Sequence, residues 1–305
     1  MGPGRGLTAS RASRLREALD ALVERTDVPS RIPHDPIAFP RRYGDPRDAE
    51  VAAVLAAFLA FGRVASFTAV LERLFAALDP SPAAFVRAFD PAARPAGLAG
   101  IGHRWTRPDD IAALLWILRV LLERHGSLGA FAASCQRPED DDTGPLLERF
   151  VAEVRAIDTS PVYGRARWTR GLGHFFARPS AGSACKRLSL LLRWLVRPED
   201  GLDLGLWRRV PPAKLVVPLD THVLRIGRYL GLTRRRTGGW AAALDITRAF
   251  RRLSGADPLR YDFPLCHWGI SGACPTGRDA AKCRACPLVG VCAKGRVLAR
   301  RGPAA

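Results

Sequence analysis

Four cysteines stand close together near the end of the sequence, in the segment CPTGRDAAKCRACPLVGVC. They are Cys274, Cys283, Cys286 and Cys292, and their spacing is C-x8-C-x2-C-x5-C. A C-x2-C turn lets two sulfurs face one centre, and the outer pair can close a cage around it. These four thiolates therefore predict a bound zinc ion or an iron–sulfur cluster, because both take four cysteine ligands.

A second candidate is an acid at the start of a predicted helix. The stretch PLDTHVLRIGRYLGL, residues 218–232, places Asp220 directly before an amphipathic run. Aspartate is a favoured helix N-cap, so this carboxylate has a structural interpretation. It also has a chemical one, because a carboxylate can stabilise a developing cation or deprotonate a nucleophile. The local pattern leaves both interpretations open.

The elements that must position these residues are predicted to be helices. Asp45-Pro46 is a typical helix start, and the run AEVAAVLAAFLAF behind it is apolar on every face, which predicts a buried helix. Thr106-Arg107-Pro108-Asp109 repeats the start signal with capping-box spacing. Further helical patterns are PLLERFVAEVRAI, CKRLSLLLRWLVR, THVLRIGRYLGL and WAAALDITRAFRRL. No alternating strand pattern of any length occurs, so we expect an all-α fold.

The charge of the chain indicates its partner. The 305 residues carry a formal net charge of +18 and the pI is about 10.9. Such an excess attracts a polyanion, nucleic acid first and an anionic membrane surface second, although a GC-rich genome would also raise the arginine count. The longest apolar run is too short for the ~20 residues that span a bilayer, and no secretory signal is visible. We expect a soluble, cytoplasmic protein with reduced thiols.

Two motifs together resemble a known family. LDTHVLRIGRYLGL, then YDFPLCHWGISGAC and the four-cysteine loop, are similar to the C-terminal half of the endonuclease III-like DNA glycosylases, members of the helix-hairpin-helix superfamily. The matching positions are Leu219-Asp220-Thr221-His222, then Asp262, His267, Trp268 and Cys274. The resemblance implies that Asp220 is the catalytic aspartate and that the cysteines hold a [4Fe–4S] cluster in place of zinc. The first cysteine gap is eight residues here, and six in the family.

The same resemblance extends upstream to a lysine. GSACKRLSLLLRWLV resembles the second helix of the family's hairpin and puts Lys186 at the position of the catalytic lysine. The hairpin reads PSAGSACK where the family has L-P-G-V-G-x-K. The 34 residues from Lys186 to Asp220 exceed the family's usual interval and resemble the archaeal 8-oxoguanine glycosylases, so we expect a divergent bacterial branch. Lys214 is the alternative amine.

The predicted DNA contacts follow from the same comparison. Gly182 and Ser183 of the hairpin would offer backbone N–H groups to a phosphate, with Arg187 beside them. Arg63, after the first buried helix, would enter the space that an extruded base leaves. Arg225 would reach a phosphate from the helix behind Asp220.

These observations combine into one prediction. We expect a two-lobed helix-hairpin-helix glycosylase fold, with a helical barrel over 47–215, its hairpin near 178–186, and an iron–sulfur lobe of 1–46 plus 216–305 around the cluster loop 274–292. The expected activity is base-excision repair of double-stranded DNA that contains a damaged base, with AP lyase activity through Lys186. The alternatives are a monofunctional glycosylase and a non-catalytic iron–sulfur protein that binds nucleic acid. We expect a monomer.

Overall fold

The computed structural model describes residues 8–277 and 279–300, and the side chains up to Val297. Within these residues the chain forms helices and no β-strand, apart from one isolated bridge between His103 and Thr106. The predicted all-α class is therefore confirmed. None of the described helices is long and apolar enough to cross a membrane. The chain divides into a central unit, Val28–Lys214, and a terminal unit made of the described parts of Met1–Asp27 and Leu215–Ala305.

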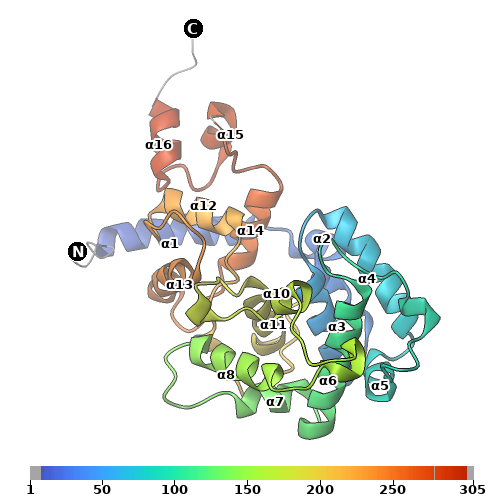
Figure 1. Cartoon of the computed structure of the whole chain (residues 1–305). Helices are drawn as coiled ribbons and strands as arrows, with labels where there is room; N and C mark the ends of the chain where they lie inside the picture. The colour runs from blue at the N-terminus through green and yellow to red at the C-terminus, as the bar shows by residue number, and fades with distance from the viewer. Residues whose placement is uncertain (1–7, 278, 301–305) are drawn as a thin grey trace. The chain divides into compact units, whose positions relative to one another are not determined.

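The central unit contains ten α-helices and several 3-10 turns (Figure 1). The helices are α2 (Val28–Arg31), α3 (Pro46–Leu59), α4 (Val64–Leu78), α5 (Pro82–Ala88), α6 (Pro108–His125), α7 (Leu128–Ser134), α8 (Thr143–Arg155), α9 (Ser160–Tyr163), α10 (Arg170–Phe175) and α11 (Lys186–Val196). The 3-10 turns are η1 (Ile32–His34), η2 (Pro36–Ala38), η3 (Pro40–Arg42), η4 (Ala96–Leu98), η5 (Pro179–Ala181) and η6 (Pro212–Lys214).

Helix α3 is the core of the central unit. Asp45 caps it by accepting the N–H of Arg47 at 2.8 Å, and every residue from Asp48 to Leu59 is buried. Helices α11, α5, α4 and α7 pack around it, which confirms that its nearly continuous apolar pattern, with Asp48 and Glu50 as the exceptions, reflects burial on all sides.

The start of α6 is also confirmed, with a different cap. The helix begins at Pro108, and the Asp110 carboxylate accepts the N–H of Arg107 at 2.8 Å. Thr106 lies just ahead of the cap and is buried, with its backbone bridged to His103.

Residues 28–46 belong to the central unit, whereas the sequence pattern predicted that they belong to the terminal one. Turns η2 and η3 pack on α3, and Phe39 stacks on Phe75 of α4 with ring centroids 5.1 Å apart. Phe39 and Phe75 are 36 positions apart, so no local pattern indicates this packing. The second change of unit falls at Leu215, one residue from the predicted position.

The long interval between the predicted lysine and aspartate contains an ordered extension of the central unit, residues 197–214. Trp207 anchors it, because its indole N–H donates to the buried carboxylate of Glu50 on α3 at 2.6 Å. Glu50 also accepts two backbone N–H groups at the start of α7, at 2.9 and 2.5 Å. Burial raises the pKa of Glu50, and these donors oppose the rise. One carboxylate therefore joins α3, α7 and the extension.

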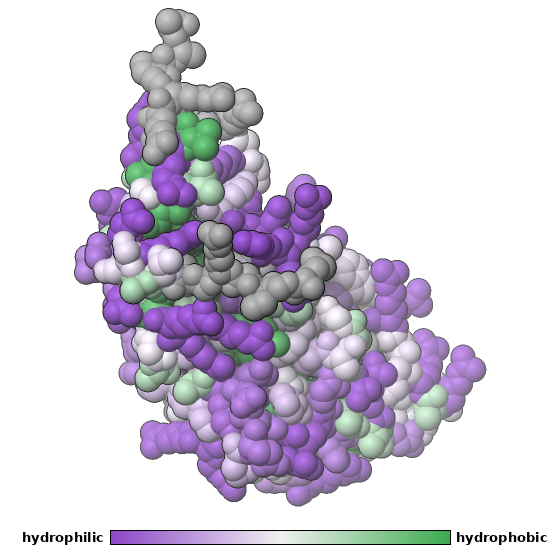
Figure 2. Space-filling model, turned by 90° about the vertical axis from the view of Figure 1, so that its left-hand side faces the viewer, coloured by the Kyte–Doolittle hydropathy of each residue, from purple (hydrophilic) through white to green (hydrophobic). Residues whose placement is uncertain are grey.

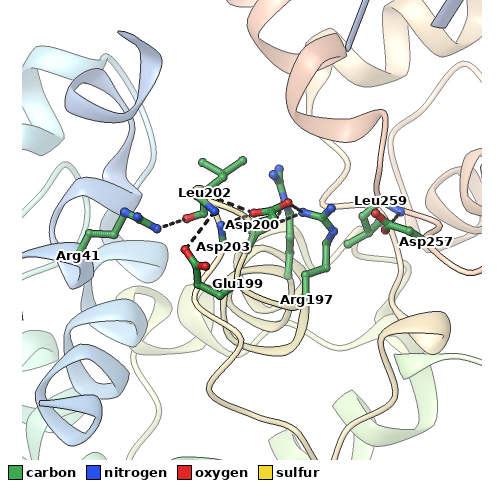
Figure 3. Close-up of polar contacts among 10 residues, drawn as sticks. Arg41, Arg197, Glu199, Asp200, Leu202, Asp203, Asp257 and Leu259 are labelled. Atoms are coloured by element: carbon green, nitrogen blue, oxygen red, sulfur yellow. Dashed lines mark hydrogen bonds and ion pairs between the residues drawn. The ribbon is translucent and has the colours of Figure 1, made fainter. Parts of the chain in front are cut away.

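An ion network holds the same extension (Figure 3). Asp203 is 0% exposed and pairs with the guanidinium groups of Arg193 and Arg197. Asp200 pairs with Arg197 at 2.9 Å, and Arg41 donates to a backbone carbonyl of the same loop at 2.9 Å. The extension is thus fixed to α11 by buried charge as well as by apolar packing.

The terminal unit brings the two ends of the chain together. Its helices are α1 (Ala9–Glu24), α12 (Thr221–Leu230), α13 (Trp240–Ser254), α14 (Asp262–Ile270), α15 (Ala280–Ala285) and α16 (Ala293–Arg300). Helix α12 packs against α14, α13 and α16, and α1 packs against α13 and α14 (Figure 1). Three leucines of α1 are buried in this unit, so the N-terminal helix completes the core of the C-terminal segment.

Replacement of Asp203 by Asn is expected to lower the free energy of unfolding by about 3–5 kcal/mol, because Arg193, only 3% exposed, would lose a buried counter-charge. Asp200→Asn is the matched control, with an expected loss of at most about 1 kcal/mol, since the Asp200 side chain is 39% exposed. Chemical denaturation of both variants measures the difference, and equal losses would contradict the assigned role of the buried carboxylate.

Candidate functional site

The predicted catalytic lysine is the first residue of a helix that follows a tight hairpin. The hairpin runs from α10 through η5 to α11, and Lys186 is the first residue of α11. Gly182 and Cys185 both have left-handed backbones, with φ of 76° and 48°, which turn the chain back on itself. Cys185 provides no side-chain cap, so the N-terminal turn of α11 presents a positive helix end suited to an anion.

Four hydrogen bonds, three of them half-buried and one exposed, hold this hairpin in place. Glu148 of α8 accepts the N–H of Ser180 at 2.6 Å and the Nε–H of Arg178 at 3.1 Å. The Cys185 thiol donates to a backbone carbonyl at 3.3 Å, and its N–H donates to Ser183 at 3.1 Å. Gly182 is exposed at the tip, but its backbone N–H already donates to the Pro179 carbonyl at 2.9 Å, so the predicted phosphate contact through this N–H is not available in this turn.

Four rings gather beside the start of α11. Phe61 lies 4.5 Å from His103, 5.2 Å from Trp105 and 4.9 Å from His174, measured between ring centroids. The Trp105 ring also lies 4.8 Å from that of His174 and is 38% exposed, so part of this cluster faces solvent. We call Phe61, His103, Trp105 and His174 the aromatic cluster.

Arginines surround the aromatic cluster. The guanidinium of Arg187 lies 4.9 Å above the Phe61 ring, and that of Arg104 lies 4.8 Å from the Trp105 ring. Arg187 also donates to the backbone carbonyl of His174 at 3.1 Å and to its ring nitrogen. No carboxylate pairs with Arg187 in the described part of the chain, and its burial lowers the pKa to about 10. An anionic ligand would supply the missing counter-charge.

His174 is held neutral by the same neighbours. Burial, followed by the charges of Arg187, Arg104 and Arg170, lowers the pKa of His174 to about 4. A neutral imidazole can accept the hydrogen bond from Arg187, whereas a protonated one would repel it. His174 therefore orients Arg187 at neutral pH.

The sequence indicates only parts of this arrangement. Arg187 is a predicted DNA contact, but nothing in the sequence singles out His174, because it lies on α10 in a segment without a motif. The aromatic residues at 61 and 105 are 44 positions apart, and only the packing of α3 against the following loops brings their rings together. Arg63, also a predicted contact, is exposed at the start of α4.

Asp220 lies in the terminal unit as the N-cap of α12. It accepts the N–H of Val223 at 2.7 Å through Oδ1, and the Cys266 thiol donates to its Oδ2 at 3.3 Å. The predicted capping role is therefore confirmed, while one carboxylate oxygen is also directed by a side chain of α14. The sequence predicts only a packing role for Cys266, since a single cysteine outside the cluster has no spacing signal.

The four predicted cysteine ligands lie in one short loop region of the terminal unit. Burial raises the pKa values of Cys274, Cys283 and Cys286, and the neighbouring thiol of Cys292 raises each of them further. Cys274 raises the pKa of Cys286 in the same way. Cys292 therefore lies near each of the other three thiols, and Cys274 lies near Cys286. Among the described residues, however, no three His, Cys, Asp or Glu side chains meet as ligands of one metal ion would.

Donor groups surround the cysteine loop, and all come from the terminal unit. Lys294 donates to the backbone carbonyls of residues 275–277, at 3.2, 2.9 and 2.5 Å. The N–H of Gly295 donates to Cys292 Sγ at 3.2 Å. Among the described residues the indole N–H of Trp268 is directed toward the Cys286 thiol and lowers its pKa, and it has no other acceptor there. Positive charge and free N–H groups are what a cluster of thiolates and sulfides requires.

Arg225 belongs to this site. Its guanidinium donates to the backbone carbonyl of Cys274 at 2.9 Å and opposes the burial-driven rise in the pKa of that thiol. The residue predicted to reach a DNA phosphate therefore joins α12 to the cysteine loop.

Lys214, the alternative amine, donates to two backbone carbonyls of the central unit at 2.7 and 3.2 Å. These contacts give Lys214 a structural role. Lys186 is half-buried at the first turn of α11 in the central unit, and Asp220 is half-buried in the terminal unit.

Replacement of Arg187 by Gln is expected to raise the pKa of His174 from about 4 toward its ordinary value of 6.5, because a neighbouring positive charge is removed. NMR titration of the ring protons measures this shift. Arg170→Gln is the control, and it should shift the pKa less, because burial and the charges of Arg187 and Arg104 act more strongly on His174 than Arg170 does.

The same titration predicts a pH effect on stability. The unfolded chain binds the His174 proton near pH 6.5 and the folded chain only near pH 4, so the folded state loses stability as the pH falls through this window. A His174→Gln variant should lose less stability than the wild type between pH 7 and pH 4. An identical pH profile would contradict the neutral state of His174.

Comparison with known proteins gives one family. The match covers residues 35–271, which include the hairpin, Lys186, Asp220 and Cys266 and end before Cys274. Neither the curated proteins nor the solved structures contain a match to this chain. Since the matched segment is more than half of the chain, the protein belongs to the DUF2400 family, described as a protein of unknown function.

Proposed function

We propose that this protein is a DNA glycosylase with AP lyase activity, built on a helix-hairpin-helix fold. The observation that carries the proposal is the hairpin, where a left-handed turn leads into Lys186 at the uncapped start of α11. The first turn of α11 would offer its backbone N–H groups to one phosphate, while Lys186 would present an amine beside it. The +18 charge supports a nucleic acid as the substrate.

The chemistry uses the amine as a nucleophile. The neutral Nζ of Lys186 attacks C1′ of the damaged nucleotide, and the bond from C1′ to the base nitrogen breaks. The base takes the bonding electron pair and is protonated as it leaves. Opening of the sugar gives an iminium ion between Nζ and C1′. Loss of a proton from C2′ then expels the 3′ phosphate by β-elimination and cuts the strand.

Asp220 would stabilise the positive charge that develops on the sugar as the base departs. Its Oδ1 is engaged by the helix N-terminus, and Cys266 directs its Oδ2, so the carboxylate is held in one orientation. The two side chains come from different units, and the proposal requires that both act on one extruded nucleotide.

The aromatic cluster supports recognition of an extruded base or of the strand around it. Trp105 is exposed, and nucleobases stack on such rings with a free energy of about 1–3 kcal/mol each. The guanidinium of Arg187, which lies over the Phe61 ring, would neutralise the negative charge of an adjacent phosphate. We propose an oxidised purine such as 8-oxoguanine as the damaged base, because the long lysine-to-aspartate interval resembles that of the archaeal 8-oxoguanine glycosylases.

The four cysteines would hold a [4Fe–4S] cluster. They suit one because Cys292 lies near the other three thiols, and Arg225, Lys294 and the indole N–H of Trp268 flank the loop. A single zinc ion would draw four sulfurs to within about 2.3 Å of one point, whereas a cluster spreads them farther apart. When bound, the cluster would stabilise the loop between α14 and α16.

Borohydride trapping tests the lysine. The wild-type protein, mixed with a panel of single-lesion duplexes and borohydride, is expected to form a covalent adduct, and Lys186→Gln should abolish it. Lys214→Gln is the matched control and should leave the adduct unchanged. Asp220→Asn should slow base release by at least about 100-fold. An adduct that persists in Lys186→Gln would exclude this amine, and base release without strand cleavage would indicate a monofunctional glycosylase.

Anaerobic purification tests the cluster. We expect four iron atoms per chain and a broad visible absorption band, because four cysteine ligands suit one such cluster and zinc, a d¹⁰ ion, has no such band. Cys286→Ser should reduce the iron content, whereas Cys135→Ser, outside the loop, should not. One zinc per chain without visible absorption would contradict the proposed cofactor.

A further inference from the structure

An arginine-lined cavity lies in the terminal unit. Its volume is about 1110 Å³. Eight arginines from five segments line it: Arg11, Arg14, Arg228, Arg234, Arg236, Arg248, Arg252 and Arg296. We call it the arginine basin. Neither Lys186, Asp220 nor any of the four cysteines lines it. Gly290 and Val291 do, so the basin adjoins the cysteine loop but contains none of the residues assigned to catalysis or to metal ligation.

The charge of the basin is only slightly compensated by the acid that lines it. Across the described residues, none of its eight guanidinium groups forms an ion pair with a carboxylate. Asp245 is the one acid among the lining residues, and it already accepts from Thr233 at 2.9 Å and from Arg235 at 3.0 Å. Like charges gathered around one cavity repel one another, so an anion within it would stabilise the protein.

The basin is shaped around the first turn of α1. Thr8 caps this helix, and no acid lies in its first turn, where the helix end is positive. Arg11 crosses to the end of α12 and donates to the Leu230 carbonyl at 3.0 Å. Gly231 makes this possible, since its φ is +73° and a Cβ there would lie 2.6 Å from the Arg11 Nη2. The helix end and the arginines therefore favour an anion at the same place.

The lining selects phosphate groups over bases. A cavity of 1110 Å³ exceeds the size of one phosphate and accommodates a chain of them. Its one aromatic ring, Tyr229, already has Lys294 Nζ 5.0 Å from its centroid, so stacking of a base is not supported. Figure 2 views the molecule from the side to which the N-terminal end of α1 points in Figure 1, and hydrophilic atoms predominate on that face.

We propose that the arginine basin binds the phosphate backbone of DNA at a second place, separate from the nucleotide that is processed. The choice of DNA over another polyphosphate rests on the proposed function, whereas the site itself rests on the cavity and its charges. Such binding is independent of base sequence and raises affinity for undamaged duplex, from which a search for damage begins.

The test is the salt dependence of binding to an undamaged duplex. In the triple variant Arg234→Gln/Arg248→Gln/Arg252→Gln, the slope of log K against log salt should decrease by about 0.9 for each phosphate that the protein no longer neutralises. Affinity at low salt should weaken by on the order of 10- to 100-fold. These side chains are exposed, so the fold should be retained, and the thermal midpoint checks this.

Two matched variants separate the basin from net charge. Arg25→Gln/Arg73→Gln/Arg124→Gln removes three exposed charges outside the basin and should leave the slope nearly unchanged. Replacement of the three basin arginines by Lys keeps the charge and should preserve binding. Equally weakened binding in the basin and control variants, or unchanged binding in the basin variant, would overturn the proposal. So would tight binding of tripolyphosphate that does not displace DNA.

Failure of the basin can be told apart from failure of the proposed glycosylase activity. Under single turnover with saturating protein, the basin variant should release base at the wild-type rate, because no catalytic residue lines the cavity. Weakened DNA binding without base release from any lesion would support the basin and reject the glycosylase. Base release together with unchanged DNA binding in the basin variant would support the glycosylase and reject the basin.

Discussion

Burial of carboxylates is the constraint on which much of this protein depends. Six acids are buried among the described residues, whereas Arg193 is the one buried arginine there. The buried acids accept hydrogen bonds from helix ends, indole and guanidinium groups, as Glu50 and Asp203 do in the central unit. Because these carboxylates are buried in the interior, the net charge exposed on the surface is more positive than the composition alone implies. The excess positive charge on the surface repels itself, and an external anion would reduce this repulsion.

The two units use the remaining positive charge differently. In the central unit, Arg187 is half-buried against Phe61 and is oriented by a neutral His174, so one cation is held at a defined place. In the terminal unit, exposed arginines surround an open cavity, and their joint field matters more than the position of any one. Under the proposed function, the first arrangement would suit recognition of one particular phosphate and base. The second would suit binding of a nucleic-acid backbone independently of its base sequence.

The terminal unit also shows how residues outside a motif shape the site within it. Four cysteines define the loop, yet Arg225 of α12 and Lys294 of α16 hold its backbone through carbonyl groups. The same helix α12 begins at Asp220, where Cys266 directs the carboxylate, and ends at the arginine basin. One ten-residue helix thus connects three features, so a displacement of α12 would affect all of them together.

The sequence by itself determined the helical class, the starts of α3, α6 and α12, the buried α3 and the cysteine loop, because caps, apolar periodicity and ligand spacing are local properties of the chain. The cap of Asp220 followed from the residues beside it. Only the tertiary structure decided that Glu50 would join α3 to Trp207, that Phe61 would meet Trp105, and that Arg11 would share a cavity with Arg296. These partners lie 44 to 285 positions apart, and no local pattern specifies which distant side chains will meet when a common core is buried.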